Sequence, residues 1–263
     1  MSLDGRPAPL DVLRYVEERR DGMVCLLRRL TAAESPSDVP ETQEEVREVI
    51  ASQLESLDYT VRRIPGRSSG GMLHARPRKR PHGGRAQMIL GHYDTVWPVG
   101  TLEGMPFEYD GDVVKGPGVY DMKGGVVQAL LAIEALQHFG IDPTVTPHVF
   151  FNSDEEIGSR DSRRYIEKLA AGMERVFVLE PSLGPTGRLK TARKGIGRFT
   201  VRVHGEAAHA GLDPGAGASA ILELSHVIQE LFALNDLDRG VTVNVGTIDG
   251  GLRPNVVAPT SVN

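Results

Sequence analysis

The stretch MILGHYDTV, residues 88–96, joins an apolar run to a pair of polar side chains. Its first three residues are typical of a buried strand, and His92 and Asp94 follow where that strand would end. Farther along, GGVVQALLAIEALQHF at 124–139 has the apolar spacing of an amphipathic helix. A buried strand followed by such a helix indicates an α/β arrangement.

Two further apolar runs, at 149–151 and 176–179, have the same length and composition as the first. Helical spacing of apolar residues also occurs earlier, at 9–30 and 41–57. Strands that alternate with helices in this way predict an α/β fold built on a mostly parallel sheet.

The pattern changes after about residue 194. Residues 199–203 and 241–245 alternate between apolar and polar side chains, as half-exposed strands do, and 217–234 is helical in spacing. We therefore predict two domains, an α/β domain over residues 1–193 and a smaller α+β domain over residues 194–263.

Composition excludes several classes of protein. Of the 263 residues, 40% are hydrophobic and 25% charged, which argues against a disordered chain, and the net charge of −5 argues against a dedicated nucleic-acid binder. The segment 62–87 has eight Lys and Arg and no acid, but it lacks aromatics, which favours a solvated loop or hairpin. A single Cys25, no apolar leader and no membrane-length apolar run predict a cytoplasmic protein that does not bind membranes.

Four polar clusters are each expected directly after an apolar strand. In open α/β sheets ligands bind beyond the carboxyl ends of the strands, so these clusters are expected to meet there. So many carboxylates would repel one another unless a cation neutralised them, and a pair of divalent metals would do so. The clusters are GHYDTV at 91–96, GVYDMKGG at 118–125, SDEEIG at 153–158 and LEP at 179–181.

Each cluster taken alone has a simpler structural interpretation. His92 could be a strand-end histidine bonded to a nearby carboxylate, and Asp121 could cap the helix that follows it. Glu155 and Glu156 could form a solvated acidic turn, and Glu180 could be any carboxylate at the end of a strand. The four clusters together favour a metal site, because independent accidents would not all fall at such positions.

The residue types also fit one kind of chemistry. Imidazole and carboxylate ligands without thiolate suit Zn²⁺, Mn²⁺ or Co²⁺ in a hydrolytic site. Of two adjacent glutamates, one can bind metal while the other acts as general base. In the His-x-Asp pair, Asp94 can accept the second ring N–H of His92 and so fix its orientation.

Five motifs in this order resemble those of the M20 family of co-catalytic metallopeptidases, in its glutamate carboxypeptidase branch, the carboxypeptidase G2 type. The resemblance extends from about residue 20 to the end of the sequence. It implies a zinc-peptidase catalytic domain with a smaller lid and dimerisation domain, both incomplete at the C-terminus. The motifs are GHYDTV, GVYDMKGG, SDEEIGS, VLEPS and HGEAAHAG.

The resemblance also implies a role for individual residues. Asp121 would bridge two zinc ions, or two Co²⁺ or Mn²⁺ ions, with a cis peptide bond after it. His92 and Glu180 would each bind a different ion beside it, and Glu156 would bind on the other side.

The remaining roles implied by the resemblance concern catalysis. Asp94 would orient His92, and Glu155 would be the general base. His209 would reach the active site of the other subunit of a homodimer and stabilise the oxyanion, and Asn255 would lie near the substrate.

The implied reaction is hydrolysis of a peptide or amide bond that releases a C-terminal amino acid such as glutamate. An N-acyl amino acid deacylase on the same scaffold is the alternative within the enzyme class. The family's last histidine ligand and its carboxylate-binding arginine have no counterpart before Asn263. A truncated, non-catalytic chain is therefore a further alternative.

Overall fold

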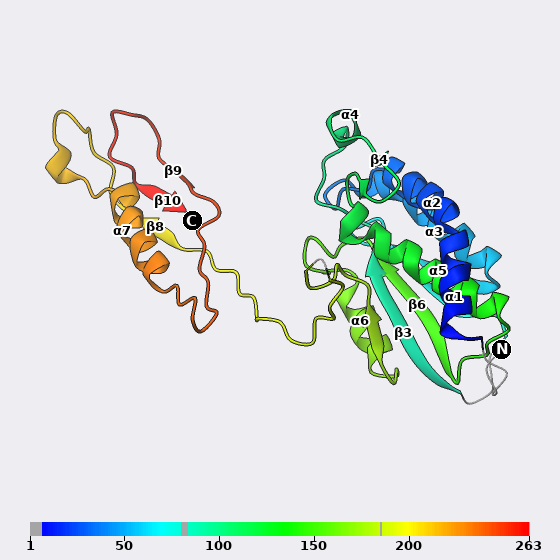
Figure 1. Cartoon of the computed structure of the whole chain (residues 1–263). Helices are drawn as coiled ribbons and strands as arrows, with labels where there is room; N and C mark the ends of the chain where they lie inside the picture. The colour runs from blue at the N-terminus through cyan, green and yellow to red at the C-terminus, as the bar shows by residue number, and fades with distance from the viewer. Residues whose placement is uncertain (1–6, 80–83, 185, 263) are drawn as a thin grey trace. The chain divides into compact units, whose positions relative to one another are not determined.

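The computed structural model describes residues 7–79, 84–184 and 186–262 (Figure 1). The chain divides into two compact units, which we name unit 1 (Met1–Arg188) and unit 2 (Leu189–Asn263). The boundary expected after residue 193 falls in the same stretch, which is free of helices and strands until residue 202.

A five-stranded sheet forms the centre of unit 1. Its central strand β6 pairs in parallel with β3, which pairs in parallel with β7, whereas β2 pairs antiparallel with β6 and β1 with β2. The α/β class is confirmed, but the sheet is mixed rather than mostly parallel. In sheet order the strands are β1 (Tyr59–Ile64), β2 (Met72–Pro77), β6 (Val145–Asn152), β3 (Arg85–His92) and β7 (Val176–Val178).

The antiparallel part of the sheet comes from the basic segment. The hairpin of β1 and β2 occupies much of residues 62–87, and β2 lies between two other strands. The segment is thus a hairpin, as one of the two expectations had it, but it is built into the sheet rather than extending into solvent. Its apolar residues Met72, Leu73 and Ala75 are buried, which the number of basic residues around them did not indicate.

Helices cover both faces of this sheet. The helical stretch predicted at 9–30 is two helices that meet at Arg19. Buried side chains of α2, α3 and α5 pack on one face, and α6 packs on the other. The helices are α1 (Pro9–Glu18), α2 (Arg20–Ala32), α3 (Gln43–Ser56), α5 (Gly124–His138) and α6 (Arg163–Ala170). Shorter elements are η1 (Pro40–Thr42), α4 (Thr101–Gly104), β4 (Glu108–Tyr109), β5 (Val114–Lys115) and the irregular turn η2 (Val119–Lys123).

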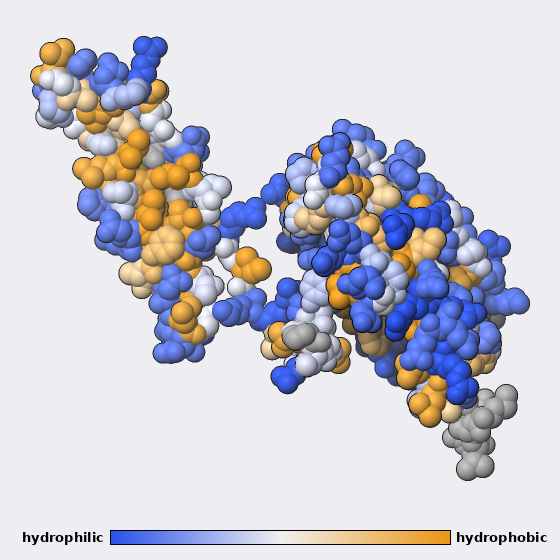
Figure 2. All heavy atoms as spheres, turned by 45° about the horizontal axis from the view of Figure 1, so that its top comes forward, coloured by the Kyte–Doolittle hydropathy of each residue, from blue (hydrophilic) through white to orange (hydrophobic). Residues whose placement is uncertain are grey.

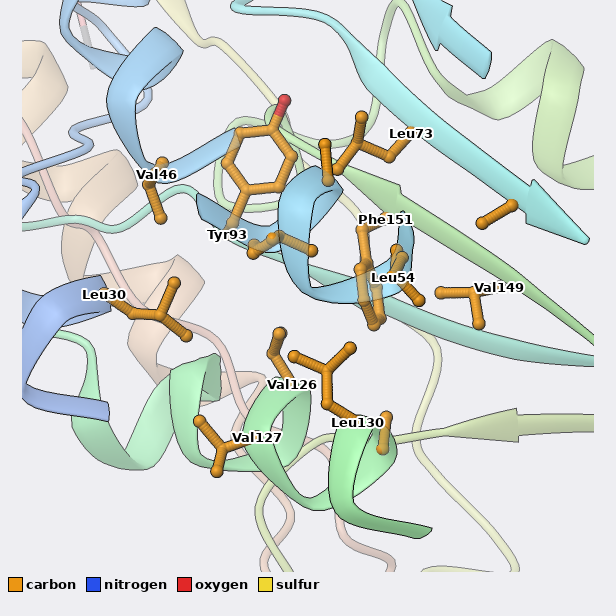
Figure 3. Close-up of a cluster of buried hydrophobic side chains, with 14 of the residues drawn as sticks. Leu30, Val46, Leu54, Leu73, Tyr93, Val126, Val127, Leu130, Val149 and Phe151 are labelled. Atoms are coloured by element: carbon orange, nitrogen blue, oxygen red, sulfur yellow. The ribbon is translucent and has the colours of Figure 1, made fainter. Parts of the chain in front are cut away.

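The core of unit 1 follows from the period of the strands. Neighbouring residues of a strand point to opposite faces, so Phe151 of β6 packs toward α5 while Phe150 packs toward α6. Figure 3 shows Val126 and Leu130 of α5 facing the strand residues from below. Because both faces are covered, the central strands are apolar on both sides, which is why they read as continuous apolar runs.

Unit 2 is built from a helix and short strands. Its sheet has the order β8 (Arg202–His204), β10 (Thr260–Val262) and β9 (Asp249–Gly250), all antiparallel. The predicted helix at 217–234 is present as α7 (Ala220–Ala233), whose N-cap Ser219 accepts a hydrogen bond from the Leu222 N–H. The short helix η3 (Pro214–Ala216) precedes it.

The two strands predicted in unit 2 are corrected by the structure. The strand expected at 199–203 is reduced to β8, and residues 241–245 form no strand. There the side chain of Asn235 takes the place of a neighbouring strand, since its Oδ1 accepts from the Val243 N–H at 2.8 Å and its Nδ2 donates to the Val243 carbonyl at 3.1 Å. Within the described part of the chain, the helices are too short or too polar to span a lipid bilayer.

Candidate metal centre

The polar clusters of unit 1 gather at one edge of the sheet. His92 is the last residue of β3, Glu155 and Glu156 follow β6, and Glu180 follows β7. Because these three strands run parallel, their carboxyl ends lie together. Asp121 completes the group, but it lies in the turn η2 before α5 and not, as had been expected, directly after a strand of this sheet.

Three of these side chains come close enough to hold one ion. The Nε2 atom of His92 lies 3.1 Å from Oδ1 of Asp121 and 3.6 Å from Oε1 of Glu180. One ligand atom from each residue lies within 4.8 Å of the other two. His92 is buried, whereas the Asp121 side chain is 51% exposed, so the group is open to solvent on the aspartate side. Among the described residues, no other group of His, Cys, Asp or Glu meets this test.

The other ring nitrogen of His92 is held by Asp94. Nδ1 lies 3.0 Å from the backbone carbonyl of Asp94 and 3.3 Å from its carboxylate Oδ1. A hydrogen on Nδ1 therefore has acceptors, and Nε2 is directed at the carboxylates of Asp121 and Glu180. This is the arrangement in which a partner of the second nitrogen fixes the tautomer and orientation of a metal-binding histidine.

The electrostatics of the group call for a positive charge. Burial alone would lower the pKa of His92, but hydrogen bonds to Asp121 and Asp94 outweigh it and raise that pKa to about 11. Burial, together with the negative charge of Asp121, raises the pKa of Glu180 to about 7 and also raises the pKa of Glu156. The carboxylates thus favour a cation among them, either a proton on the imidazole or a metal ion.

Glycines allow the chain to bring these residues together. Gly118 has φ of +66°, and a Cβ there would lie 2.5 Å from the Thr95 side chain. A Cβ on Gly125 would lie 2.1 Å from the carbonyl oxygen of Leu179, so only glycine lets the segment that carries Glu180 pass so close to the start of α5. The peptide bond between Asp121 and Met122 is cis, as the resemblance implied.

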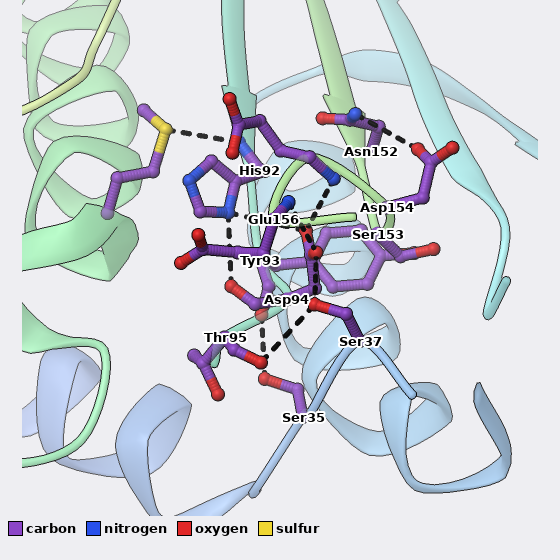
Figure 4. Close-up of polar contacts among 12 residues, drawn as sticks. Ser35, Ser37, His92, Tyr93, Asp94, Thr95, Asn152, Ser153, Asp154 and Glu156 are labelled. Atoms are coloured by element: carbon purple, nitrogen blue, oxygen red, sulfur yellow. Dashed lines mark hydrogen bonds and ion pairs between the residues drawn. The ribbon is translucent and has the colours of Figure 1, made fainter. Parts of the chain in front are cut away.

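The turn that carries Glu155 and Glu156 is tied to Asp94. The backbone N–H of Glu155 donates to Oδ1 of Asp94 at 3.3 Å, and that of Glu156 donates to Oδ2 at 3.2 Å (Figure 4). Glu155 is exposed and Glu156 is half-buried. Neither carboxylate belongs to the group of three residues that could hold one ion. Both carboxylates can therefore take another role at the site.

Several buried polar residues that support the site were not identified from the sequence. Ser37 donates to Asp94, and Gln43 donates to the carbonyls of Pro36 and Ser153. Asp154 accepts from the N–H groups of Asp161 and Ser162 and so holds the loop before α6. The stretch SPSD at 35–38 has the composition of a loop, and nothing local to it indicates a partner far along the chain.

A buried lysine also anchors the loop of Asp121. Lys123 donates from Nζ to the carbonyls of Leu30 at 2.7 Å and Ala33 at 3.1 Å, at the end of α2. Burial lowers its pKa to about 7, against the charges of Glu34 and Asp94. The lysine thus satisfies carbonyls that the helix end leaves without a partner.

Two candidate residues lie in unit 2. His209 is exposed, and its Nδ1 accepts from the N–H groups of Gly211 and Leu212 at 3.1 Å each. A neutral His209 ring that accepts at Nδ1 carries its hydrogen on Nε2, which can then act as a donor. The carbonyl of Asn255 accepts from the Ala210 N–H at 3.0 Å, so the two predicted residues lie on adjoining segments.

The residues present fit a divalent metal. The donors are one imidazole nitrogen and carboxylate oxygens without thiolate, which suits zinc, manganese or cobalt. His92 has its second nitrogen engaged by Asp94, and its Nε2 faces the carboxylates of Asp121 and Glu180.

Comparisons with known proteins identify the family of the chain. The family model described as Peptidase family M20/M25/M40 matches residues 88–245. Carboxypeptidase G2 of Pseudomonas sp. (strain RS-16) is 30% identical over 214 residues, which cover 79% of this chain and 50% of that protein. A probable carboxypeptidase of Arthroderma benhamiae is 30% identical over 194 residues, with 66% and 41% covered. The chain thus spans about half the length of these curated relatives or less.

A solved structure shows the same fold. A tripeptidase from Staphylococcus aureus matches with a TM-score of 0.69 at 17% identity, over 91% of this chain and 64% of that one.

Proposed function

The chain belongs to the M20/M25/M40 family of peptidases, and from this premise we propose that it hydrolyses an amide bond to release a C-terminal amino acid such as glutamate. The observation that carries the proposal is the meeting of His92 Nε2, Asp121 and Glu180 beside a turn with two further glutamates. The 30% identity to carboxypeptidase G2 supports the choice of a carboxypeptidase.

We assign the metal ligands from the geometry. His92, Asp121 and Glu180 would hold one zinc ion, since one ligand atom from each lies within 4.8 Å of the other two. This differs from the expectation that His92 and Glu180 bind different ions. Asp121, whose carboxylate is half-exposed, would also bind a second ion, for which Glu156 would be a further ligand. When bound, such a pair of ions activates water and polarises the substrate carbonyl.

The chain's own residues then move the protons. Glu155 stands exposed at the edge of the site, with its backbone fixed by Asp94, and accepts a proton from the attacking water. The same carboxyl group afterwards gives that proton to the leaving amine. Asp94 keeps the ring of His92 and the turn of Glu155 in one fixed relation throughout.

Residues of unit 2 complete the proposal. His209 donates from Nε2 to the oxyanion, because its Nδ1 is already occupied by two backbone N–H groups. In the homodimer that we propose, it serves the site of the partner subunit. Asn255, on the adjoining segment, contacts the substrate.

A panel of substrates tests the proposed reaction. Zinc-loaded protein, as this chain and as any longer protein that contains it, is incubated with N-acyl and peptidyl glutamates, N-acetyl amino acids and unblocked dipeptides. Release of free glutamate at the highest kcat/KM supports the proposal. Preference for N-acetyl amino acids would make the protein a deacylase instead. No hydrolysis of any substrate by the longer, zinc-loaded protein would overturn the proposal.

A further inference from the structure

The segment Ser35-Pro36-Ser37 lies against the residues that follow β3. The Ser37 N–H donates to the Thr95 carbonyl at 3.0 Å, and the Thr95 N–H donates to the Ser35 carbonyl at 2.9 Å. Pro36 and Thr95 thereby form a parallel bridge outside the named strands. The segment is thus held beside Asp94 by the backbone alone, whatever its side chains do.

The hydroxyl of Ser37 is bonded to the carboxylate of Asp94. Its Oγ donates to Oδ2 at 2.6 Å, and both side chains are buried, with Ser37 at 4% exposure and Asp94 at none (Figure 4). A short bond to a buried carboxylate is among the stronger hydrogen bonds in proteins. It is also shorter than the contacts of that carboxylate with His92, Glu155 and Glu156, which lie between 3.2 and 3.3 Å.

The carboxylate of Asp94 joins the two halves of the proposed site. Oδ1 faces Nδ1 of His92 and the Glu155 N–H, and Oδ2 faces the Glu156 N–H. Without the Ser37 hydroxyl, Oδ2 keeps only the longer bond to Glu156, and the carboxylate can rotate. Rotation would leave Nδ1 of His92 with only the Asp94 carbonyl at 3.0 Å as its partner, and it would loosen the glutamate turn at the same time.

We propose that Ser37 is a positioning residue of the metal centre, which fixes the Asp94 carboxylate and through it both the ring of His92 and the turn of Glu155 and Glu156. The inference rests on the proposed function in that it takes His92 as a metal ligand. Buried Gln43 also ties the segment of Ser37 to the end of β6. Its Nε2 donates to the Pro36 carbonyl at 2.9 Å and to the Ser153 carbonyl at 3.2 Å.

Ser35 offers a matched control in the same segment. It is 1% exposed, and its Oγ also donates over 2.6 Å, but to the backbone carbonyl of Tyr93 rather than to Asp94. Ser35→Ala and Ser37→Ala therefore remove the same group and a bond of the same length. Only Ser37→Ala removes a partner of the carboxylate.

The test measures zinc affinity by competition with a chromophoric chelator in the whole chain. Ser37→Ala is expected to weaken Zn²⁺ binding about 10- to 100-fold, as the loss of a partner that orients a metal ligand does. Ser37→Thr, which keeps the hydroxyl, and Ser35→Ala should stay within about threefold of the original protein. Far-UV circular dichroism and Tm show which variants are folded.

Hydrogen exchange of the metal-free protein gives a second readout. The amides of Glu155 and Glu156 should exchange faster in Ser37→Ala than in Ser35→Ala. This comparison holds even if the added methyl of Ser37→Thr prevents folding. Equal zinc affinities and equal exchange in the two alanine variants would overturn the inference, as would an original protein that binds no zinc. Zinc binding that responds to Ser37→Ala without any amide hydrolysis would instead support the inference and count against the proposed function.

Discussion

Unit 1 and unit 2 use their apolar residues in different ways. Unit 1 buries large side chains on both faces of its sheet, among them Leu54, Phe150 and Phe151. In unit 2, the described residues that are both apolar and buried are Ala220, Leu224 and Ala258. Figure 2 shows apolar side chains at the surface of unit 2, and Phe199 is 86% exposed.

This difference shows which conditions a strand-like sequence pattern needs before it forms a strand. Apolar runs in unit 1 became strands because neighbouring strands paired with them and helices covered them. The alternating segment at 241–245 in unit 2 met neither condition and formed no strand. Strand propensity therefore acted only where tertiary packing supported it.

A pair of phenylalanine variants tests this comparison most strongly. Phe151→Ala removes a fully buried ring from the core of unit 1 and should lower the free energy of unfolding by about 3–5 kcal/mol. Phe199→Ala should change it by less than about 0.5 kcal/mol, because the ring is already exposed. Urea denaturation followed by circular dichroism measures both. Similar losses in the two variants would show that unit 2 has a core of its own.

The next effect concerns catalysis in unit 1. Glu155→Gln keeps the shape of the side chain but removes the proton acceptor, so kcat should fall about 10²- to 10⁴-fold while zinc content stays the same. Glu167→Gln, at an exposed position on α6, is the control and should leave kcat unchanged. Loss of zinc in Glu155→Gln would instead place Glu155 among the metal ligands.

The contribution of unit 2 to catalysis should be smaller. His209→Ala removes the proposed oxyanion donor and should lower kcat about 10²- to 10³-fold, with zinc affinity unchanged. His226→Ala, at an exposed position on α7, is the matched control.

Mixing two inactive proteins then asks which subunit His209 serves. Mixed dimers of His209→Ala and Glu155→Gln should regain activity, because one of their two sites has both an intact base and an intact partner histidine. No recovery after proven subunit exchange would mean that His209 acts within its own chain or not at all.

Zinc should stabilise the two units unequally. At zinc concentrations about 100-fold above Kd, binding adds about 2.7 kcal/mol to the folded state, and a chelator removes it. Hydrogen exchange should slow at 88–95 and 118–124 in unit 1, where the ligands lie, and stay the same across 202–262. Zinc-dependent protection confined to unit 2 would contradict the assigned ligands.

The sequence by itself determined the α/β class and the edge at which the site lies. Short apolar runs that are followed by His92, Glu155 and Glu180 were enough to predict this edge. The reason is that the carboxyl ends of parallel strands lie together wherever the strands pair. The order of the motifs also indicated the family, and the cis bond after Asp121 followed from that resemblance. These features are encoded locally, in residue type and spacing.

Only the tertiary structure decided which side chains lie close together at the candidate site and which residues hold them in place. It placed His92 Nε2 3.6 Å from Oε1 of Glu180, and it brought Ser37 to Asp94 across 57 residues of sequence. It also determined that the hairpin of β1 and β2 enters the sheet and that residues 241–245 form no strand. Such contacts depend on packing and on hydrogen bonds between distant residues, and no local pattern in the sequence carries that information.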